Sequence, residues 1–369
     1  MGRLKTSICF AVTNDLNFDQ RMIRICGSLS AAGHEVSLVG RCKSQSAALH
    51  PQSFGQERLS CWFEKGKLFY LEFNIRLFLY LLFQKASILG AVDLDTLWAV
   101  SLAARIKGSK LVYDAHEYFS EVPEVVDRPR VQAFWEWTAR QLIPRVDLAY
   151  TVCGSLADLF AKKYGMPFEL VRNVPLLRPP SEQSPAQPPV LLYQGALNQA
   201  RGLEVAIQAM QQIEGVELWL AGEGDLSEEL RRLVRQLDLE RRVRFLGHVL
   251  PEDLHQLTPQ ATIGLNLLEN KGLNYYYSLA NKTFDYIMAG RPAIHMDFPE
   301  YRLLNEEFEI ALLLPELAVD PLCQAIRQLL EDPILYERLA QNCRQARRVL
   351  NWTVEEQRLL DCYRKINPA

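Results

Sequence analysis

The stretch Asn281-Lys-Thr-Phe-Asp-Tyr-Ile-Met-Ala-Gly-Arg-Pro-Ala-Ile294 predicts a short helix, a sharp stop and the start of a buried strand. Asn281 can cap the first turn, and three apolar side chains fall on one helical face. Gly290 suits the left-handed position that follows a last helical turn, and Pro292 prevents the helix from continuing. We therefore expect a helix that leads directly into a strand.

Lys282 stands in the first turn of this helix, and Asp285 follows three residues later on the same face. Free backbone N–H groups and the helix dipole at a helix start favour an anion. A cation at that position, with a carboxylate one turn later, can hold the diphosphate and the ribose of a nucleotide. The alternative is that Lys282 and Asp285 form an exposed helical ion pair, which is common on helices.

The composition is that of a globular protein. The chain has 369 residues, of which 49% are apolar and 23% charged. This length exceeds one ordinary core, so we expect two domains. The net charge of -3 does not indicate a nucleic-acid partner. The longest purely apolar run, Leu77–Phe83, is too short to cross a bilayer.

The cysteines give no sign of a disulfide framework or a metal centre. All eight are scattered, without a Cys-x-x-Cys motif or a cysteine/histidine cluster. This usage favours reduced thiols, so we expect a cytoplasmic protein without a metal site.

The first half of the chain alternates strands and helices, which predicts a parallel sheet. We expect strands at residues 7–13, 35–40, 87–92, 110–113, 147–152 and 168–171, and helices at 19–32, 96–107, 130–144 and 155–164. Residues 43–66 are poorly patterned, so loops are expected there. The first strand-to-helix turn lacks the Gly-x-Gly-x-x-Gly fingerprint, which argues against dinucleotide binding.

Residues 68–83 are rich in aromatic and aliphatic side chains, with cations around them at Lys65, Lys67, Arg76 and Lys85. We expect a strand followed by a helix that packs in the core of the first domain. The alternative is a helix on a membrane surface, which would place the protein peripherally at the inner face of the membrane. Glu72 and the lack of a long basic face favour the core.

A proline-rich segment divides the chain. Residues 175–189 carry six prolines together with Ser, Gln and Glu, which predicts a stiff polar linker. We assign residues 1–174 to a first domain and 190–350 to a second, in which strand and helix alternation restarts.

In the second domain the pattern again predicts strands followed by helices. We expect strands at 190–194, 216–221, 243–246 and 261–268 and from Ala293, a tyrosine-rich loop at 274–277, and helices after Gly202, after Asp225 and at 251–257, 320–330, 334–350 and 354–366. The expected fold is therefore α/β, with two doubly wound, Rossmann-like parallel sheets and a ligand in the cleft between them.

Polar residues follow the expected strand Lys110–Tyr113, in the sequence Asp114-Ala-His-Glu117. Open α/β sheets bind ligands just past the carboxyl ends of their strands. His116 is therefore a candidate general base or substrate contact. The alternative is an ordinary loop histidine with its hydrogen bonds satisfied.

The second domain contains several parts suited to an anion. Gly195 ends a strand, and Arg201 opens the following helix. With Lys282, this gives two cations near helix starts, which suits the two phosphates of a nucleotide diphosphate. The loop Gly222-Glu-Gly224 allows a close backbone approach at the sheet edge.

Together these motifs resemble the retaining glycosyltransferases of the GT-B fold, in particular family 4, also called group 1. The resemblance covers nearly the whole chain. It rests on Asp19-Gln-Arg21, Gly33-His-Glu-Val36, Val112-Tyr-Asp-Ala-His-Glu117, Leu220-Ala-Gly-Glu-Gly-Asp225, Val243-Arg-Phe-Leu-Gly-His248, Asn281-Lys282, Phe284-Asp-Tyr286 and Gly290-Arg-Pro292. A subset from bacterial surface-polysaccharide clusters also shares Asn14-Asp15, Asp93-Leu-Asp95 and Asn274–Tyr277.

The resemblance implies a role for each matching position. Arg201 and Lys282 would hold the donor diphosphate and stabilise the leaving group, and Asp285 would bind the ribose. The donor side would further include Gly195, Gly222, Glu223, Gly224, Gly247, His248, Tyr277, Ser278 and Asn281. In the first domain, His116 would face the sugar and the acceptor, with Asn14, Asp15 and Glu117 on the acceptor side. Residues 351–369 would form a helix that packs back on this acceptor-side domain.

Three positions depart from the family pattern. The family usually has a glutamate where this chain has Tyr277, and an arginine where it has Ala196. The second acidic position is Asp285, a shorter side chain than the usual glutamate. These changes concern the sugar, phosphate and ribose contacts of the expected site.

The family resemblance implies metal-independent transfer of a sugar, with retention, from a nucleotide-diphosphate donor to a glycan or lipid-linked acceptor. In that reaction the departing phosphate takes the acceptor's proton, so no pair of glycosidase-type carboxylates and no cofactor is expected. Two alternatives stay open at this point. One is a nucleotide-sugar epimerase on the same fold, and the other is a non-catalytic scaffold of a polysaccharide complex.

Overall fold

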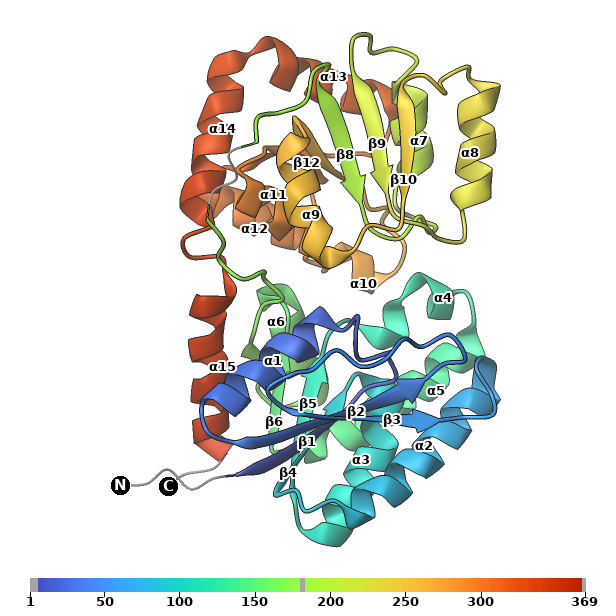
Figure 1. Ribbon diagram of the computed structural model, residues 1–369, viewed down its shortest axis with the longest axis vertical. Helices are drawn as coiled ribbons and strands as arrows, with labels where there is room; N and C mark the ends of the chain where they lie inside the picture. Colours follow the sequence, from blue (N-terminus) through green and yellow to red (C-terminus); the bar gives the residue numbers. More distant parts are fainter. Residues whose placement is uncertain (1–5, 180–182, 367–369) are drawn as a thin grey trace. The chain divides into compact units, whose positions relative to one another are not determined.

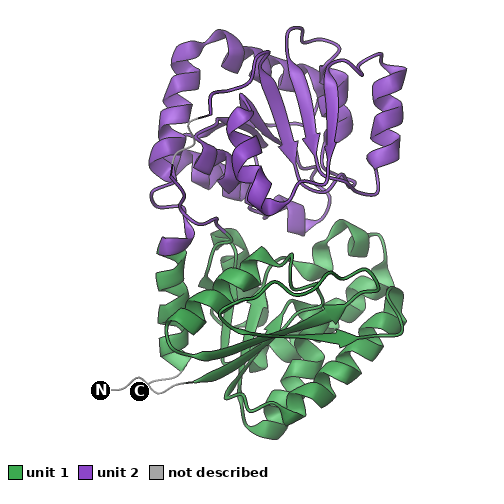
Figure 2. Ribbon diagram, viewed as in Figure 1, with its two compact units in different colours: residues 1–173, 354–369 green, residues 174–353 purple. Residues whose placement is uncertain are grey.

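A computed structural model describes residues 6–179 and 183–366, and these residues form two compact units (Figure 2). Unit 1 comprises the residues up to Asn173 together with those from Val354 onward. Unit 2 comprises Val174–Thr353. Parts of the expected first domain, linker and final segment, namely residues 1–5, 180–182 and 367–369, lie outside the described residues.

The described part of unit 1 is built on a seven-stranded parallel sheet in the order β3-β2-β1-β4-β5-β6-β7. The strands are β1 Ser7–Ala11, β2 Glu35–Cys42, β3 Gly55–Ser60, β4 Ile88–Val92, β5 Lys110–Ala115, β6 Leu148–Thr151 and β7 Glu169–Leu170. Every residue of β4 is buried, because this central strand is covered by helices on both faces of the sheet.

Helices join these strands, except that β2 leads to β3 without one (Figure 1). They are α1 Gln20–Ala31, α2 Gly66–Phe83, α3 Leu94–Lys107, α4 Pro123–Val126, α5 Pro129–Leu142 and α6 Gly154–Tyr164, with short 3₁₀ turns η1 Phe119–Glu121 and η2 Ile143–Arg145. The last helix, α15 Trp352–Ile366, belongs to unit 1 from Val354 onward. Within unit 1 its Glu355 accepts hydrogen bonds from the backbone and side chain of Arg172.

Unit 2 contains a six-stranded parallel sheet in the order β10-β9-β8-β11-β12-β13 among its described residues. The strands are β8 Val190–Gln194, β9 Glu217–Ala221, β10 Val243–Gly247, β11 Ile263–Asn266, β12 Ala293–Met296 and β13 Ala311–Leu314. The helices are α7 Leu203–Ala209, α8 Ser227–Gln236, α9 Pro251–Leu257, α10 Leu273–Tyr276, α11 Asn281–Ala289, α12 Pro299–Phe308, α13 Val319–Glu331 and α14 Pro333–Ala346, with one 3₁₀ turn, η3 Thr258–Gln260.

The two Rossmann-like parallel sheets confirm the expected fold class. The helix at the opening stretch is also confirmed as α11, and Gly290 takes the left-handed conformation after its last turn with φ of 68°. The capping prediction was wrong: Ala280 precedes the helix, and Asn281 is its first residue. An alanine has no side chain that can accept from the helix N–H groups.

Four other expectations about secondary structure were wrong. Residues 43–66 are not all loop, because they contain the edge strand β3. Residues 68–83 form one continuous helix, α2, without a preceding strand. The expected loop at 274–277 contains the short helix α10. Helix α12 and strand β13 complete the unit 2 sheet where only helices were expected.

Candidate active site

Helix α11 is fixed against the unit 2 sheet by a buried tyrosine. The Tyr286 hydroxyl lies within hydrogen-bonding distance of two carbonyl oxygens, 2.9 Å from that of Leu192 and 3.1 Å from that of Leu265. Gly264 makes room for the ring, since a Cβ at that position would overlap it. This anchor sets the start of α11, one turn earlier, at the carboxyl ends of β8 and β11.

Lys282 lies in this first turn and is buried, with 7% of its surface exposed. Its Nζ is 3.8 Å from the centre of the Tyr193 ring, a cation–π contact, and has no hydrogen-bond partner. The Gly195 backbone lies directly beside the ammonium, since a Cβ there would be 3.6 Å from Nζ. This burial excludes the alternative in which Lys282 and Asp285 form an exposed helical ion pair.

The environment of Lys282 disfavours its charge. Burial, together with the nearby Arg201 guanidinium, lowers the pKa of Lys282 well below its ordinary value, and Asp285 only partly offsets this. A buried ammonium without a hydrogen-bond acceptor is costly. The arrangement is therefore suited to an anion that enters beside Gly195 and supplies the missing acceptor.

Arg201 is half-buried, and its guanidinium carbon lies 4.6 Å from the centre of the Tyr275 ring. Its Nε has no hydrogen-bond partner. The Ser278 hydroxyl donates to the Tyr275 carbonyl, 2.9 Å away. Tyr275 thus contacts the expected phosphate-binding arginine, while Tyr277 packs against the ring of Tyr276, with 5.0 Å between ring centroids.

Asp285 is positioned by a chain of side-chain hydrogen bonds. Gln194 Nε2 donates to Asp285 Oδ2 over 2.7 Å, and Thr258 Oγ1 donates to Gln194 Oε1 over 2.9 Å. This chain links the end of β8, the turn η3 and α11. It orients the carboxylate toward the same strand end as Lys282.

The glycine loops lie close together at this edge of the sheet. Gly222 has φ of 148°, and a Cβ there would overlap the Gly195 carbonyl oxygen, so only glycine fits. A Cβ at Gly224 would likewise overlap the loop that follows Gly195. After β8 and β9, the two chain segments therefore lie so close that no side chain fits between them at Gly222 and Gly224.

Glu223 and the residues at the end of β10 lie at the exposed rim of the candidate donor site. Arg231 donates to the Glu223 carboxylate over 2.6 Å. Hydrogen bonds with Ser227 and Arg231 lower the pKa of Glu223. A Cβ at Gly247 would lie 3.8 Å from Glu223 Oε1. His248, which follows, is exposed, as is Asn281 at the start of α11.

Three buried polar residues at this edge were missed from the sequence. Asn266 and His295 are paired in register at the ends of β11 and β12, and neither side chain has a hydrogen-bond partner. Thr283, next to Lys282, has an unpartnered hydroxyl. Burial and the nearby Lys282 charge lower the pKa of His295 to about 3, so this ring is neutral.

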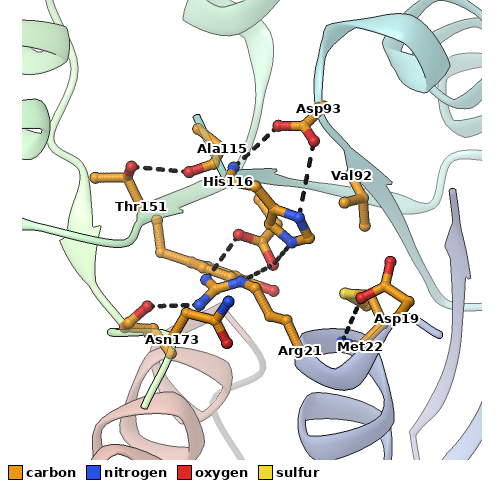
Figure 3. Close-up of polar contacts among 12 residues, drawn as sticks. Asp19, Arg21, Met22, Val92, Asp93, Ala115, His116, Thr151 and Asn173 are labelled. Atoms are coloured by element: carbon orange, nitrogen blue, oxygen red, sulfur yellow. Dashed lines mark hydrogen bonds and ion pairs between the residues drawn. The ribbon is translucent and has the colours of Figure 1, made fainter. Parts of the chain in front are cut away.

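A second polar cluster lies in unit 1, at the carboxyl end of β5 (Figure 3). Arg21 from α1 donates two hydrogen bonds to the buried Asp114 carboxylate, over 2.8 and 3.1 Å. His116 Nε2 lies 3.2 Å from the same carboxylate, and its Nδ1 lies 3.7 Å from Asp93 Oδ2. In Figure 3 Asp93 lies on one side of His116 and Arg21 on the other.

The carboxylates keep His116 protonated. Burial alone would lower the pKa of His116, but Asp114 and Asp93 raise it to about 9. The pKa of Asp114 is lowered in spite of its burial, because Arg21 and His116 both favour the charged form. The raised pKa of His116 favours the imidazolium form, in which the ring donates hydrogen bonds.

Asp93 holds the turn that carries His116. Its Oδ1 accepts a hydrogen bond from the His116 backbone N–H over 3.0 Å. Its φ of 58° is unusual for a residue other than glycine, and such strain is concentrated at functional sites. Next to it, Asp95 accepts from the Thr13 hydroxyl over 2.6 Å, and burial raises the pKa of Asp95 to about 7.

The expected acceptor-side residues after β1 have different surroundings. Asn14 is exposed and donates to the Asp19 side chain over 3.1 Å. Asp15 is buried and accepts from Arg58 of β3 and from Ser46 of the segment between β2 and β3, which ties it to the edge of the sheet. Among these residues Asn14 has the more accessible side chain. Glu117 follows His116 and is partly exposed.

Both halves of the chain match glycosyltransferase family models. Residues 20–176 match Glycosyltransferase Family 4, and residues 188–332 match the model described as Glycosyl transferases group 1. Each match covers most of one sheet domain. The two halves of the chain therefore match the two domains of family 4, group 1 glycosyltransferases, and its two parallel sheets are those of a GT-B fold.

Individual proteins agree with these family matches. The chain is 23% identical over 264 residues to an alpha-D-kanosaminyltransferase of Streptomyces kanamyceticus, covering 65% of this chain and 66% of that protein. It is 29% identical over 176 residues to the lipopolysaccharide core biosynthesis glycosyltransferase LpsD of Rhizobium meliloti, covering 47% of this chain and 48% of that one. The chain thus spans two thirds or less of these relatives.

The fold is also that of a solved structure, Anabaena HepE in complex with UDP and glucose. The TM-score is 0.78 at 16% identity, over 98% of this chain and 100% of that one. Such a likeness shows a shared fold. Across the described residues, no helix is long and apolar enough to cross a membrane.

Proposed function

We propose that this protein transfers a sugar from a nucleotide-diphosphate donor to a glycan or lipid-linked acceptor. One observation carries the proposal: Lys282 Nζ is buried beside the Gly195 backbone, near Arg201, and lacks a hydrogen-bond acceptor. A diphosphate would supply oxygens to both cations. Its negative charge would also favour the protonated form of Lys282, which the free protein disfavours.

The surrounding residues suit the rest of the donor. Asp285, oriented by Gln194, can accept hydrogen bonds from ribose hydroxyls. The bare backbone at Gly222 and Gly224 allows the nucleoside to approach the sheet edge closely. Glu223, Gly247 and His248 form the exposed rim on that side. Tyr277, Ser278 and Asn281 would then face the sugar end.

The chemical step would depend on charge stabilisation. As the bond between sugar and phosphate breaks, negative charge grows on the leaving diphosphate, and fixed cations stabilise it more than they stabilise the bound donor. Arg201 and Lys282 would be these cations. We propose that the reaction is independent of metal ions and retains configuration, with the departing phosphate taking the acceptor's proton.

In unit 1, His116 would donate a hydrogen bond to the sugar or the acceptor. Its Nε2 is occupied by Asp114, while its Nδ1 lies 3.7 Å from Asp93, beyond a good hydrogen bond. An imidazolium N–H in this position can bind a hydroxyl oxygen. Asn14 and Glu117 would lie on the acceptor side.

The relatives support the biological setting of this proposal. HepE was solved with UDP and glucose, which supports a nucleotide-sugar donor. LpsD is named for lipopolysaccharide core biosynthesis, which supports a role in making a glycoconjugate or polysaccharide. Such donors are made in the cytoplasm, so we place the protein there. The family matches do not favour the epimerase or the scaffold.

Turnover of variants tests the proposal. A panel of UDP-, GDP- and ADP-sugars, screened by thermal shift, first identifies the donor. Lys282→Ala should then lower turnover by about 10²-fold or more if the ammonium stabilises the leaving group. The exposed Lys162→Ala is the matched control and should leave turnover unchanged. Near wild-type turnover in Lys282→Ala would remove the proposed role.

A further inference from the structure

Helix α2 has two apolar faces, and only one of them is covered. Phe69, Phe73, Leu77 and Leu81 are buried against unit 1. The opposite face carries exposed side chains at a spacing of three to four residues, namely Leu68, Leu71, Ile75, Leu79 and Phe83. Phe83 is 85% exposed, far more than a core residue. The sequence expectation of a core helix thus holds for one face of α2 alone.

The neighbouring helices continue this exposed surface. Helix α3 packs against α2 and against α5 (Figure 1). Exposed on α3 are Trp98, Leu102 and Ile106, and exposed on α5 are Phe134 and Trp137. The rings of Trp98 and Trp137 are 5.6 Å apart, so the two helices share one apolar cluster. We call the exposed apolar residues of α2, α3 and α5 the outer face.

The exposed charged side chains on the three helices of the outer face are of one sign. The exposed charged side chains within these three helices are all cations: Lys67, Arg105, Arg130 and Arg140. The carboxylates of the same helices are engaged: Glu72 with Arg76, Asp95 with Thr13 and Glu136 with Lys163. The nearest exposed carboxylates in the sequence, Glu64 and Asp127, lie outside the helices.

An aromatic loop stands at the start of α2 and is held in place. Trp62 is 86% exposed, and Phe63 beside it is also exposed. The backbone N–H groups of both residues donate to the Glu72 carboxylate over 2.9 to 3.0 Å. The Arg76 guanidinium carbon lies 4.8 Å from the centre of a Trp62 ring. These contacts hold Trp62 in place while its ring stays exposed.

From these observations we infer that the outer face binds the surface of a membrane containing anionic lipid. A helix with an apolar face flanked by cations and tryptophans lies in the interface between headgroups and acyl chains. Contiguous exposed apolar patches with a polar rim mark interaction sites. Anionic headgroups would complement the exposed cations at the edges.

A second copy of the chain fits the outer face less well. A twofold interface would bring the same surface of each copy together, and so would place Lys67, Arg105, Arg130 and Arg140 opposite the same four cations. Without exposed carboxylates in α2, α3 and α5, nothing on this face would neutralise them. An anionic lipid surface has no such conflict.

Vesicle cosedimentation tests this inference separately from sugar transfer, because binding is measured without donor or acceptor. The protein should sediment with vesicles of phosphatidylcholine and phosphatidylglycerol, and less with phosphatidylcholine alone. Added salt should weaken binding to the anionic vesicles. If the protein sediments with neither kind of vesicle, the inference is wrong.

Paired variants then locate the surface. Leu71→Asp with Ile75→Asp should lower the partition coefficient by about tenfold or more, because charge enters the apolar face. Ile334→Asp with Leu303→Asp, two exposed apolar positions in unit 2, is the matched control and should bind as the wild type does. Lys67→Glu should weaken binding to anionic vesicles alone, by about fivefold or more.

Two further measurements control for misfolding of the variants and for self-association. Circular dichroism and the thermal midpoint should be unchanged in Leu71→Asp with Ile75→Asp, since both side chains are exposed. Sedimentation velocity should show a monomer with or without the substitutions. A dimer that these substitutions dissociate would assign the outer face to self-association and contradict the membrane inference. Equal vesicle binding by the variant and the wild type would contradict it as well.

Discussion

The Lys282 ammonium lies 3.8 Å from the centre of the Tyr193 ring and has no hydrogen-bond partner. A cation–π contact compensates only part of the loss of water around a buried ammonium. The folded protein thus holds a charge in a position that disfavours it. Function can explain this arrangement, since a group that suits a bound ligand often reduces the stability of the free protein.

Replacing Lys282 with methionine should stabilise the free protein while abolishing transfer. Lys282→Met keeps most of the side-chain volume and removes the buried, unpartnered ammonium, so we expect a gain of about 1–3 kcal/mol in the free energy of unfolding. Denaturant unfolding without ligand measures it. The exposed Lys162→Met should change stability by no more than about 0.5 kcal/mol. A clear loss of stability in Lys282→Met would show that the ammonium has a partner in the free protein.

Binding of the nucleotide should be accompanied by proton uptake. Burial and Arg201 lower the pKa of Lys282 in the free protein, and an adjacent diphosphate would raise it again by favouring the charged form. At a pH between the two values, Lys282 takes up a proton as the nucleotide binds. Calorimetry in two buffers of different ionisation enthalpy should therefore give different binding enthalpies. The same enthalpy in both buffers would mean that Lys282 keeps one protonation state.

Transfer should decline in alkaline solution as His116 loses its proton. The pKa of His116 is raised to about 9, so the imidazolium persists at neutral pH and is lost as the pH rises through that value. Turnover should be level near neutrality and fall above about pH 9. Its contribution to stability should follow the same direction, present below about pH 6.5 and lost as the pH rises to about 9.

Asp93→Asn provides the matched test of this pH profile. Removing one of the two carboxylates that raise the pKa of His116 should move the alkaline limb to lower pH, while His116→Gln should lower turnover at every pH. An NMR titration of the His116 ring in wild type and Asp93→Asn reports the same shift without any substrate. An unmoved limb together with an unmoved NMR titration would rule out electrostatic coupling between Asp93 and His116.

The buried His295 should make unit 2 sensitive to acid. Its pKa is lowered to about 3, below that of the unfolded chain, so the unfolded state binds more protons between about pH 6.5 and pH 3. Stability should fall as the pH falls through this window, by at most about 1.4 kcal/mol per pH unit. His295→Phe should flatten the dependence, and the exposed His50→Phe should not. Denaturant unfolding at several pH values measures this, and parallel curves for all three proteins would contradict it.

Much of the fold could be predicted because buried parallel strands are continuous apolar runs. Strands β4 and β8 are buried along their whole length and were located directly. Strand β3 was missed because Gly55-Gln-Glu-Arg-Leu-Ser60 is mostly polar, and backbone hydrogen bonds to β2 hold it at the sheet edge. Helix α2 is apolar on both faces, so its sequence does not show the one-sided periodicity of most helices.

The candidate site could be predicted only in part. The position of Lys282 at a helix start is visible in the sequence, but its contact with the Tyr193 ring is not, because only packing brings Tyr193 near. Asn266 and His295 lie side by side through the register of β11 and β12. No local pattern marks such a pair. The contact of Arg21 with Asp114 could not be predicted from local sequence either, because the two residues are 93 positions apart in the chain.

The central claim is that Lys282 binds the donor diphosphate, and calorimetric titration of nucleotides tests it most directly. Wild type and Lys282→Met would each be titrated with UDP, GDP and ADP and with the matching monophosphates. We predict that one diphosphate binds the wild type, and that its affinity falls by about tenfold or more in Lys282→Met, while the monophosphate is affected less. Equal affinity of the two proteins for that diphosphate would contradict the claim.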